Sequence, residues 1–298
     1  GMGAQTLELN QHFGFDPQEI DYVILSHAHI DHSGLLPKLV KEGFAGKIFC
    51  TPATADLTQI LLADSAFIQE ADVAFVNKRR LAQGLTPIKP LYSIADAQRV
   101  FTRFVEVPYQ EKCTIDEDIS FVFTDTGHIL GSAAVHVTIK ENNKQTQISF
   151  SGDVGRYRDV ILRSPEIFNQ ADYIIIESTY GDSLHEMFKE TDEALLEHIQ
   201  ETCIENKGKL IIPAFSVGRT QELLFALNKL EVEGKLPDLP YFVDSPLSTK
   251  TTEIVKQHSN LYNKHVVELM KKDKDPFQFK GLKFITDVED SKHINTRK

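Results

Sequence analysis

The first half of the chain consists of short apolar runs, each followed by a polar loop and then by an amphipathic stretch. This pattern predicts buried strands that alternate with helices. The strands are expected at 22–25, 47–51 and 100–108. The helices are expected at 35–42 and 53–65. The charged and amphipathic stretch 66–98 predicts a helical excursion outside the sheet.

Residues 115–154 alternate between apolar and polar positions, which predicts an antiparallel meander with a hairpin at 141–144. A further strand is predicted at 172–181. From about residue 182 helical and strand patterns alternate, which predicts a second α/β unit. Its helices are expected at 186–206, 221–230 and 249–258, and its strands at 209–215 and 241–247.

The composition is that of an ordinary globular protein, with 298 residues, 41% of them hydrophobic and 25% charged. This length suffices for one large core or for two domains. A formal net charge of −11 argues against a protein that coats nucleic acid nonspecifically. It leaves a nuclease open, because metals and a local basic cluster can bind the phosphates. Lys78, Arg79 and Arg80 form such a cluster, and a solvated helix face is the alternative interpretation.

No apolar run approaches the roughly 20 residues that a membrane span requires, so no membrane partner is expected. The first residues lack the basic and apolar segments of a secretory signal. Cys50, Cys113 and Cys203 lie far apart and are odd in number, so a disulfide framework is not expected. A reducing, cytoplasmic location is therefore predicted.

The densest chemical signal is the segment 26–34, which contains three histidines and an aspartate directly after the first predicted strand. Because side chains alternate along a strand, His27 and His29 are expected to point the same way, with Asp31 and His32 in the turn that follows. Imidazole and carboxylate groups together suit zinc and similar divalent metals. The alternative is a polar loop of solvated histidines, which has no evident role in packing.

Residues 27–32 match the HxHxDH signature, and the chain therefore resembles the hydrolases of the metallo-β-lactamase fold. The resemblance implies an α/β fold with an αββα sandwich. In this family His27 and His29 would bind one metal ion, and Asp31 and His32 would bind the other.

Two glycine-containing motifs, at 126–132 and 150–156, follow predicted strands and carry His128 and Asp153. Glycines let the backbone turn tightly beside these side chains. The resemblance implies that His128 completes the first metal's histidine set and that Asp153 bridges both metals. As isolated residues both have ordinary structural interpretations, and His136, which lacks such a glycine loop, is interpreted as structural.

Residues 177–181 read Glu-Ser-Thr-Tyr-Gly and resemble the ESTYG motif of the β-CASP branch of this superfamily. That branch processes nucleic acids and includes the endonuclease of the cleavage and polyadenylation specificity factor. Glu177 matches its motif A acid, and a glutamate there resembles the RNA-processing members more than the DNA-repair nucleases. The second half also resembles the β-CASP domain of bacterial members at 212–219 and 243–247.

The resemblance implies a partial metallo-β-lactamase domain at 1–182 and a partial β-CASP domain at 183–298. The family has strands before the histidine motif and two more histidines near its end, so the chain is expected to be truncated at both ends. One of those histidines would be the general acid and the other the last ligand of the second metal. A tight first site, a weak second site and low activity are therefore predicted. Unpaired sheet edges would favour self-association, so a homodimer is a further expectation.

Ser216, Gly218 and Arg219 precede the predicted helix 221–230 and form a candidate phosphate site. Free amides at a helix N-terminus beside an arginine can bind a phosphate group. The alternative is a capping turn in which Arg219 makes an ion pair between domains.

The resemblance and the motifs together predict a zinc-dependent ribonuclease with two Zn²⁺ ions, in which Asp31, Asp153 and Glu177 are the catalytic carboxylates. RNA is the expected substrate. Three alternatives remain: a DNA-processing nuclease of the same fold, a hydrolase of small thioesters or lactams, and a noncatalytic RNA-binding subunit.

Overall fold

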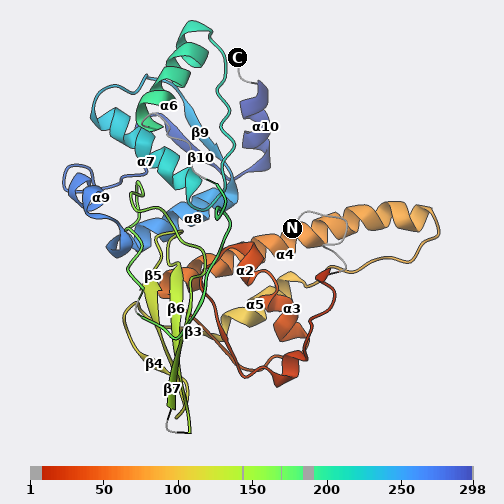
Figure 1. Cartoon of the computed structure of the whole chain (residues 1–298). Helices are drawn as coiled ribbons and strands as arrows, with labels where there is room; N and C mark the ends of the chain where they lie inside the picture. Colours follow the sequence, from red (N-terminus) through yellow and green to blue (C-terminus); the bar gives the residue numbers. More distant parts are fainter. Residues whose placement is uncertain (1–8, 143, 169, 184–190, 297–298) are drawn as a thin grey trace. The chain divides into compact units, whose positions relative to one another are not determined.

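The computed structural model describes residues 9–142, 144–168, 170–183 and 191–296, and the chain divides into two compact units (Figure 1). Unit 1 comprises residues 1–155 and 165–176, and unit 2 comprises residues 156–164 and 177–298. The predicted domain boundary after residue 182 stays a prediction.

A three-stranded parallel sheet forms the first part of unit 1, in the order β1-β2-β3. Its strands are β1 (Tyr22–Ile24), β2 (Lys47–Cys50) and β3 (Phe104–Glu106). All three predicted strand positions are confirmed, but β3 is much shorter than the predicted 100–108. Residues 100 and 101 instead end the helix α5 (Ile94–Phe101), which starts with a capping box between Ser93 and Asp96.

The helices α2 (Ile30–Ser33), α3 (Leu36–Lys41), α4 (Pro52–Ala82) and α5 complete this part, preceded by the short 3₁₀ helix η1 (Pro17–Glu19). Helix α4 starts at Pro52, next to the predicted start at residue 53, and Thr51 is its cap rather than the end of a strand. The helix does not end at residue 65. Residues 66–82 contain neither glycine nor proline, so nothing interrupts the helix before Gly84, whose φ is +71°. The predicted helical excursion is therefore largely a continuation of α4.

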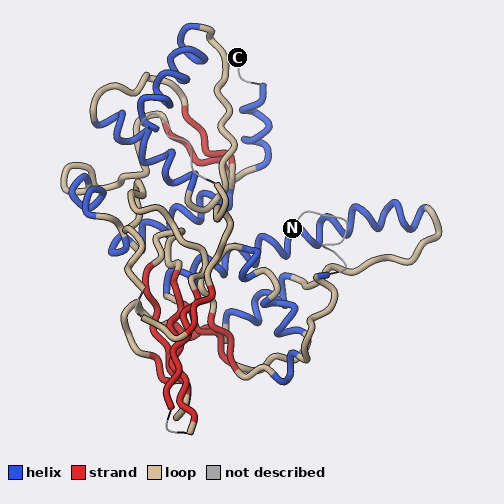
Figure 2. The backbone as a smooth tube through the Cα atoms, viewed as in Figure 1, coloured by secondary structure: helices blue, strands red, loops and turns tan. Residues whose placement is uncertain are grey.

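A five-stranded sheet forms the second part of unit 1 and lies beside the first sheet (Figure 2). Its strands are β4 (Cys113–Thr114), β5 (Ile119–Asp125), β6 (Ala133–Glu141), β7 (Lys144–Phe150) and β8 (Tyr173–Ile175). The predicted meander is confirmed, because β4 to β7 pair antiparallel in sequence order. The last strand, β8, pairs parallel to β7.

The alternation of side chains along β2 divides the core of unit 1 into two clusters. Ile48 and Cys50 point to one side and pack in a cluster with residues of α3, α4 and α5. Phe49 points to the other side and packs with Phe121 and Phe123 of the five-stranded sheet. The β1-β2-β3 sheet is therefore buried on both faces, between the helices and the second sheet.

Unit 2 contains a two-stranded parallel sheet of β9 (Tyr241–Asp244) and β10 (Leu282–Ile285). Its helical elements are α6 (Thr191–Ile199), the π-helix η2 (Gln200–Glu205), α7 (Arg219–Val232), α8 (Pro246–Gln257), the 3₁₀ helix η3 (Ser259–Leu261), α9 (Lys264–Leu269) and α10 (Val288–Thr296). Three predicted helices and the strand at 241 are confirmed, although the part of the first helix at 186–190 lies outside the described residues.

The predicted strand at 209–215 is wrong, since none of these residues is assigned to a strand. A strand needs a neighbour for its backbone hydrogen bonds, and β9 pairs with β10 instead. Ile211 and Phe215 are 84% and 85% exposed, so the apolar run is not buried within unit 2.

Among the described helices, none combines the length and apolarity that a membrane crossing needs. All three cysteines are free thiols, and Cys50 is buried.

Candidate metal centre

The first histidine loop is held by the ends of two strands. Where β1 ends, the Leu25 amide donates to the Phe49 carbonyl of β2 at 2.8 Å. The next residue, Ser26, accepts at its carbonyl from the Ala133 amide at the start of β6, also at 2.8 Å. The two sheets are thus joined at the point where the chain enters the histidine loop, which places His27 against the loop that carries His128.

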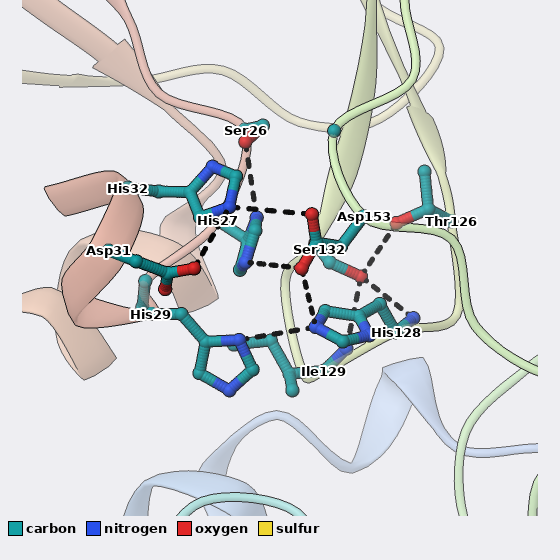
Figure 3. Close-up of polar contacts among 12 residues, drawn as sticks. Ser26, His27, His29, Asp31, His32, Thr126, His128, Ile129, Ser132 and Asp153 are labelled. Atoms are coloured by element: carbon teal, nitrogen blue, oxygen red, sulfur yellow. Dashed lines mark hydrogen bonds and ion pairs between the residues drawn. The ribbon is translucent and has the colours of Figure 1, made fainter. Parts of the chain in front are cut away.

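Four of the predicted ligands lie together at this junction (Figure 3). One possible ligand atom from each of His27, His29, His128 and Asp153 lies within 4.8 Å of the other three. His128 Nε2 lies 3.1 Å from His29 Nδ1 and 3.4 Å from Asp153 Oδ2. His27 Nε2 lies 3.7 Å from the same carboxylate oxygen. Three imidazoles and one carboxylate therefore converge on a single small volume.

The remaining two predicted ligands lie on the other side of Asp153. Asp31 and His32 belong to the single-turn helix α2 rather than to an irregular turn, and Ser33 fixes that turn by donating to the carbonyls of Ala28 and His29. His32 Nε2 lies 3.4 Å from Asp153 Oδ1 and 3.7 Å from Asp31 Oδ2.

The two carboxylate oxygens of Asp153 thus face different groups. Oδ2 faces His27 and His128, whereas Oδ1 faces His32. A carboxylate in this position can contact two metal ions at once, one on each oxygen. This arrangement supports the predicted bridging role of Asp153, which stays a prediction.

The loop that carries His128 is shaped by Ser132, whose role the sequence did not reveal. The buried Ser132 hydroxyl accepts from the amides of His128 and Ile129 at 3.0 and 3.2 Å and from the Thr126 hydroxyl at 2.9 Å. Its carbonyl accepts from the Tyr109 hydroxyl at 2.7 Å. The only sequence signal was its place at the end of the glycine-containing motif.

The N-terminus of α4 fixes the other end of this loop. The hydroxyls of Thr51 and Thr54 both donate to the Gly131 carbonyl, at 2.7 and 2.9 Å. Gly131 has φ +83°, and a Cβ there would lie 2.6 Å from the Thr54 amide nitrogen. Only glycine permits this approach. The predicted purpose of the glycines, to let the loop turn closely past its neighbours, fits this position.

Burial favours the neutral form of two histidines of the cluster, His27 and His29. The pKa of His27, which is fully buried, is lowered from 6.5 to about 2, first by burial and then by the nearby His32, His29 and His128. The pKa of His29 is also lowered, again mainly by burial. A neutral imidazole presents a lone pair, which is the form that binds a metal.

The residues present fit a metal ion. Within the described part of the chain, His27 Nε2 is buried without a hydrogen-bond partner. Its other nitrogen, Nδ1, lies 3.1 Å from the Ser26 hydroxyl. A buried polar atom without a partner is costly, and a metal ion coordinated by this nitrogen would remove that cost.

Acid is expected to destabilise the metal-free chain through His27. Below pH 6.5 the unfolded chain takes up a proton at this residue, whereas the folded chain does not until about pH 2. The contribution of neutral His27 to the free energy of unfolding is therefore fully present above pH 6.5. It is lost as the pH falls below 6.5, by at most about 1.4 kcal/mol per pH unit. We expect urea titrations with chelator to show unfolding free energy roughly 2 kcal/mol lower at pH 5 than at pH 7.

The variant His27→Gln, which cannot titrate, should lose less stability between these pH values. The matched control is His12→Gln, at an exposed histidine of the same unit, which should lose as much as the parent chain. An identical loss in all three proteins would show that His27 does not carry the effect.

His136 does not belong to the cluster, in agreement with its structural interpretation. Its ring nitrogens lie 2.9 Å from the Thr124 hydroxyl and 2.8 Å from the Ser149 hydroxyl, across β5, β6 and β7. Glu177 lies in unit 2, just after the end of β8, and is partly buried. Its predicted catalytic role stays a prediction.

The predicted phosphate-binding residues lie at the start of α7 in unit 2. The Gly218 amide donates to Gln221 Oε1 at 2.9 Å, and the Arg219 amide donates to the Val217 carbonyl at 3.2 Å. The Ser216 carbonyl accepts from Gln221 Nε2. Arg219 pairs with Glu222 of its own helix at 2.8 Å, so this ion pair does not join two domains.

Comparison with known families gives two matches. A model of the metallo-beta-lactamase superfamily matches residues 3–197, and a model of the Beta-Casp domain matches residues 220–298.

Individual relatives are similar over most of this chain. Ribonuclease TTHA0252 of Thermus thermophilus is 32% identical, over 95% of this chain and 60% of that protein. Transcription termination factor FttA of Methanosarcina mazei is 31% identical, over 88% of this chain and 39% of that protein. Endoribonuclease YSH1 of Yarrowia lipolytica is 29% identical, over 92% of this chain and 31% of that protein. The chain thus spans at most 60% of the length of these three relatives.

Proposed function

Because the chain belongs to the metallo-beta-lactamase superfamily and carries a Beta-Casp domain match, we propose that it hydrolyses phosphodiester bonds in RNA with the help of bound metal ions. The supporting observation is the convergence of His27, His29, His128 and Asp153 in one cluster. The similarity to relatives named ribonuclease and endoribonuclease supports RNA as the substrate class.

We propose zinc as the metal, because three imidazoles and a carboxylate are a ligand set typical of zinc. When bound, the metal would stabilise the negative charge that develops on the phosphodiester and activate a water molecule. His27, His29 and His128 would hold one ion, Asp31 and His32 would hold a second, and Asp153 would be shared between the two. A cytoplasmic location is part of the same proposal.

Asp31 differs from the other residues of the cluster because its side chain is 72% exposed. Its carboxylate can therefore reach solvent while Oδ2 stays 3.7 Å from His32 Nε2. We assign it the role of orienting the attacking water by accepting a hydrogen bond from it, in addition to holding metal. Ser26, whose hydroxyl lies beside His27 Nδ1, keeps that ring in place.

The test is a comparison of substrates with the zinc-loaded chain. An RNA oligonucleotide, a DNA oligonucleotide of the same sequence, a thioester and a β-lactam are each incubated with the protein, with and without chelator. We expect cleavage of RNA above the other three, loss of cleavage with chelator, and recovery when zinc is added back. A preference for DNA or hydrolysis of the small esters alone would refute the proposal.

We further propose that the Arg219 side chain contacts the RNA backbone, and that Ser216 and Gly218 hold the turn that carries it through their hydrogen bonds to Gln221. The amides of Gly218 and Arg219 already donate to groups of the same turn, so they are not available to a phosphate. The Arg219 side chain is 55% exposed and can contact a phosphate beside Glu222. Replacing Arg219 with alanine should reduce the slope of log affinity against log salt by roughly one.

The matched control for this prediction is Lys292→Ala. Lys292 is an exposed cation that pairs with Glu289 three residues before it, as Arg219 pairs with Glu222 three residues after it. Its removal should leave the slope unchanged. Equal slopes for the parent chain and the Arg219 variant would contradict the phosphate role.

A further inference from the structure

The second half of α4 and the segment after it form an arm of unit 1, residues 66–93 (Figure 1). Residues 66–82 of this helix are about 25 Å long, and the far part of the helix extends beyond α2, α3 and α5. The chain then returns along one face of the same helix. Asn77 binds both backbone groups of Ile88, at 2.9 and 2.8 Å, and Arg80 Nε donates to the Thr86 carbonyl at 2.8 Å.

The opposite face of the helical part of the arm is apolar and exposed. Phe67, Ile68, Phe75 and Leu81 are 62%, 50%, 59% and 61% exposed. Their spacing places them on one side of the helix, and three alanines share this side. These alanines are Ala71, Ala74 and Ala82. Large apolar side chains gathered on one exposed face are typical of an interaction site.

The charges beside this face change sign along the helix. Asp72 precedes Phe75 by three residues, and Arg79 follows it by four, so both lie on the same flank. Within the described part of the chain neither makes an ion pair, and the Arg79 guanidinium lies 5.0 Å from the centre of the Phe75 ring. Lys78 lies on the apolar face itself. If a second copy of the helix ran antiparallel against this face, Lys78 would lie opposite the small Ala71 of that copy.

We propose that this face docks on the same face of a second copy of the chain, with the two helices antiparallel around a two-fold axis near Phe75. In such a pair Asp72 of each copy meets Arg79 of the other, and Phe67 and Ile68 meet the region of Leu81. A parallel pair would place these two flanks on opposite sides of the interface, so Asp72 of one copy would not meet Arg79 of the other. The charge pattern thus favours the antiparallel arrangement, and this interface is separate from the sheet edges that the sequence pointed to.

The test is the mass of the chain in solution by sedimentation equilibrium, across a range of protein concentrations. We expect a concentration-dependent shift from 33.7 kDa to twice that value. Phe75→Asp would bury a charge at the centre of the pair and should raise the dissociation constant at least about 100-fold. The control Ile167→Asp changes an equally apolar residue of unit 1 that is 91% exposed and outside the arm, and it should still form dimers.

Charge reversal provides a readout that loss of folding cannot imitate. Asp72→Arg and Arg79→Asp should each weaken the dimer, whereas the double variant should restore it because the opposite charges meet again. A chain that stays at 33.7 kDa at every concentration overturns the proposal. So does a dimer that survives Phe75→Asp. If the chain is monomeric and Lys78→Glu lowers RNA affinity, the arm binds RNA rather than a second copy.

Discussion

Replacing Asp153 with asparagine should remove most of the metal from the protein and lower RNA cleavage by at least about 10³-fold, which corresponds to about 4 kcal/mol of transition-state stabilisation. The carboxylate faces histidines on both sides, with Oδ2 beside His27 and His128 and Oδ1 beside His32. Asparagine has almost the same shape but lacks the negative charge and one of the two anionic oxygens. Metal content per chain and the initial rate of RNA cleavage are the measurements.

The matched control is Asp118→Asn, which makes the same chemical change at an exposed position before β5. It should leave metal content and cleavage unchanged. The metal-free forms of both variants should unfold at nearly the same urea concentration as the parent chain, because Asp153 is only partly buried. Full metal content and full activity in the Asp153 variant would show that the assignment of the metal centre is wrong.

The cluster of His27, His29, His128 and Asp153 was predictable to the extent that its residues are close in sequence. His27 and His29 follow the end of a strand, and their expected common direction agrees with the 5.0 Å between their ring centres. His128 and Asp153 came from the resemblance to a family, because nothing in their local sequence brings them to His27. The approach of His128 to His27 depends on how β6 is aligned with the histidine loop. This alignment is fixed by the hydrogen bond from the Ala133 amide to the Ser26 carbonyl.

The residues that hold the ligands in place were the ones that the sequence could not reveal. Thr51 and Thr54 act on the Gly131 carbonyl, about 80 residues further along the chain. Ser132 acts through the amides of the loop that it closes. Such contacts between a hydroxyl and a backbone group have no spacing rule over long distances, so they emerge only from the folded chain.

The errors in the predicted elements have similar physical causes. Sequence patterns predict the end of a helix correctly where the residues at that end determine it, as at the start of α4 at Pro52. They fail at residues 209–215, where the apolar pattern of a strand is present but no described strand pairs with it. They also fail at residue 100, where an apolar valine belongs to the buried side of α5 rather than to a strand.

Replacing Gly155 with alanine should displace the proposed metal ligands without changing any of their side chains. A Cβ at this position would lie 1.9 Å from the Gly127 carbonyl oxygen and 2.7 Å from the His128 amide nitrogen, so backbone would have to move. The movement breaks the hydrogen bond from the Gly155 amide to the Thr126 carbonyl and draws Asp153 away from His128. We expect a loss of about 1–3 kcal/mol in unfolding free energy.

Metal affinity should fall together with stability in this variant, by roughly 10- to 100-fold, as it does when the support of metal ligands is lost. The matched control is Gly14→Ala, where a Cβ would meet nothing within 4 Å and neither property should change. Because every ligand is still present, raising the zinc concentration should restore part of the metal content and activity of the Gly155 variant. The Asp153 variant should not recover in the same titration. If Gly155→Ala binds metal as tightly as the parent chain, the close approach of the two loops is not what brings Asp153 and His128 together.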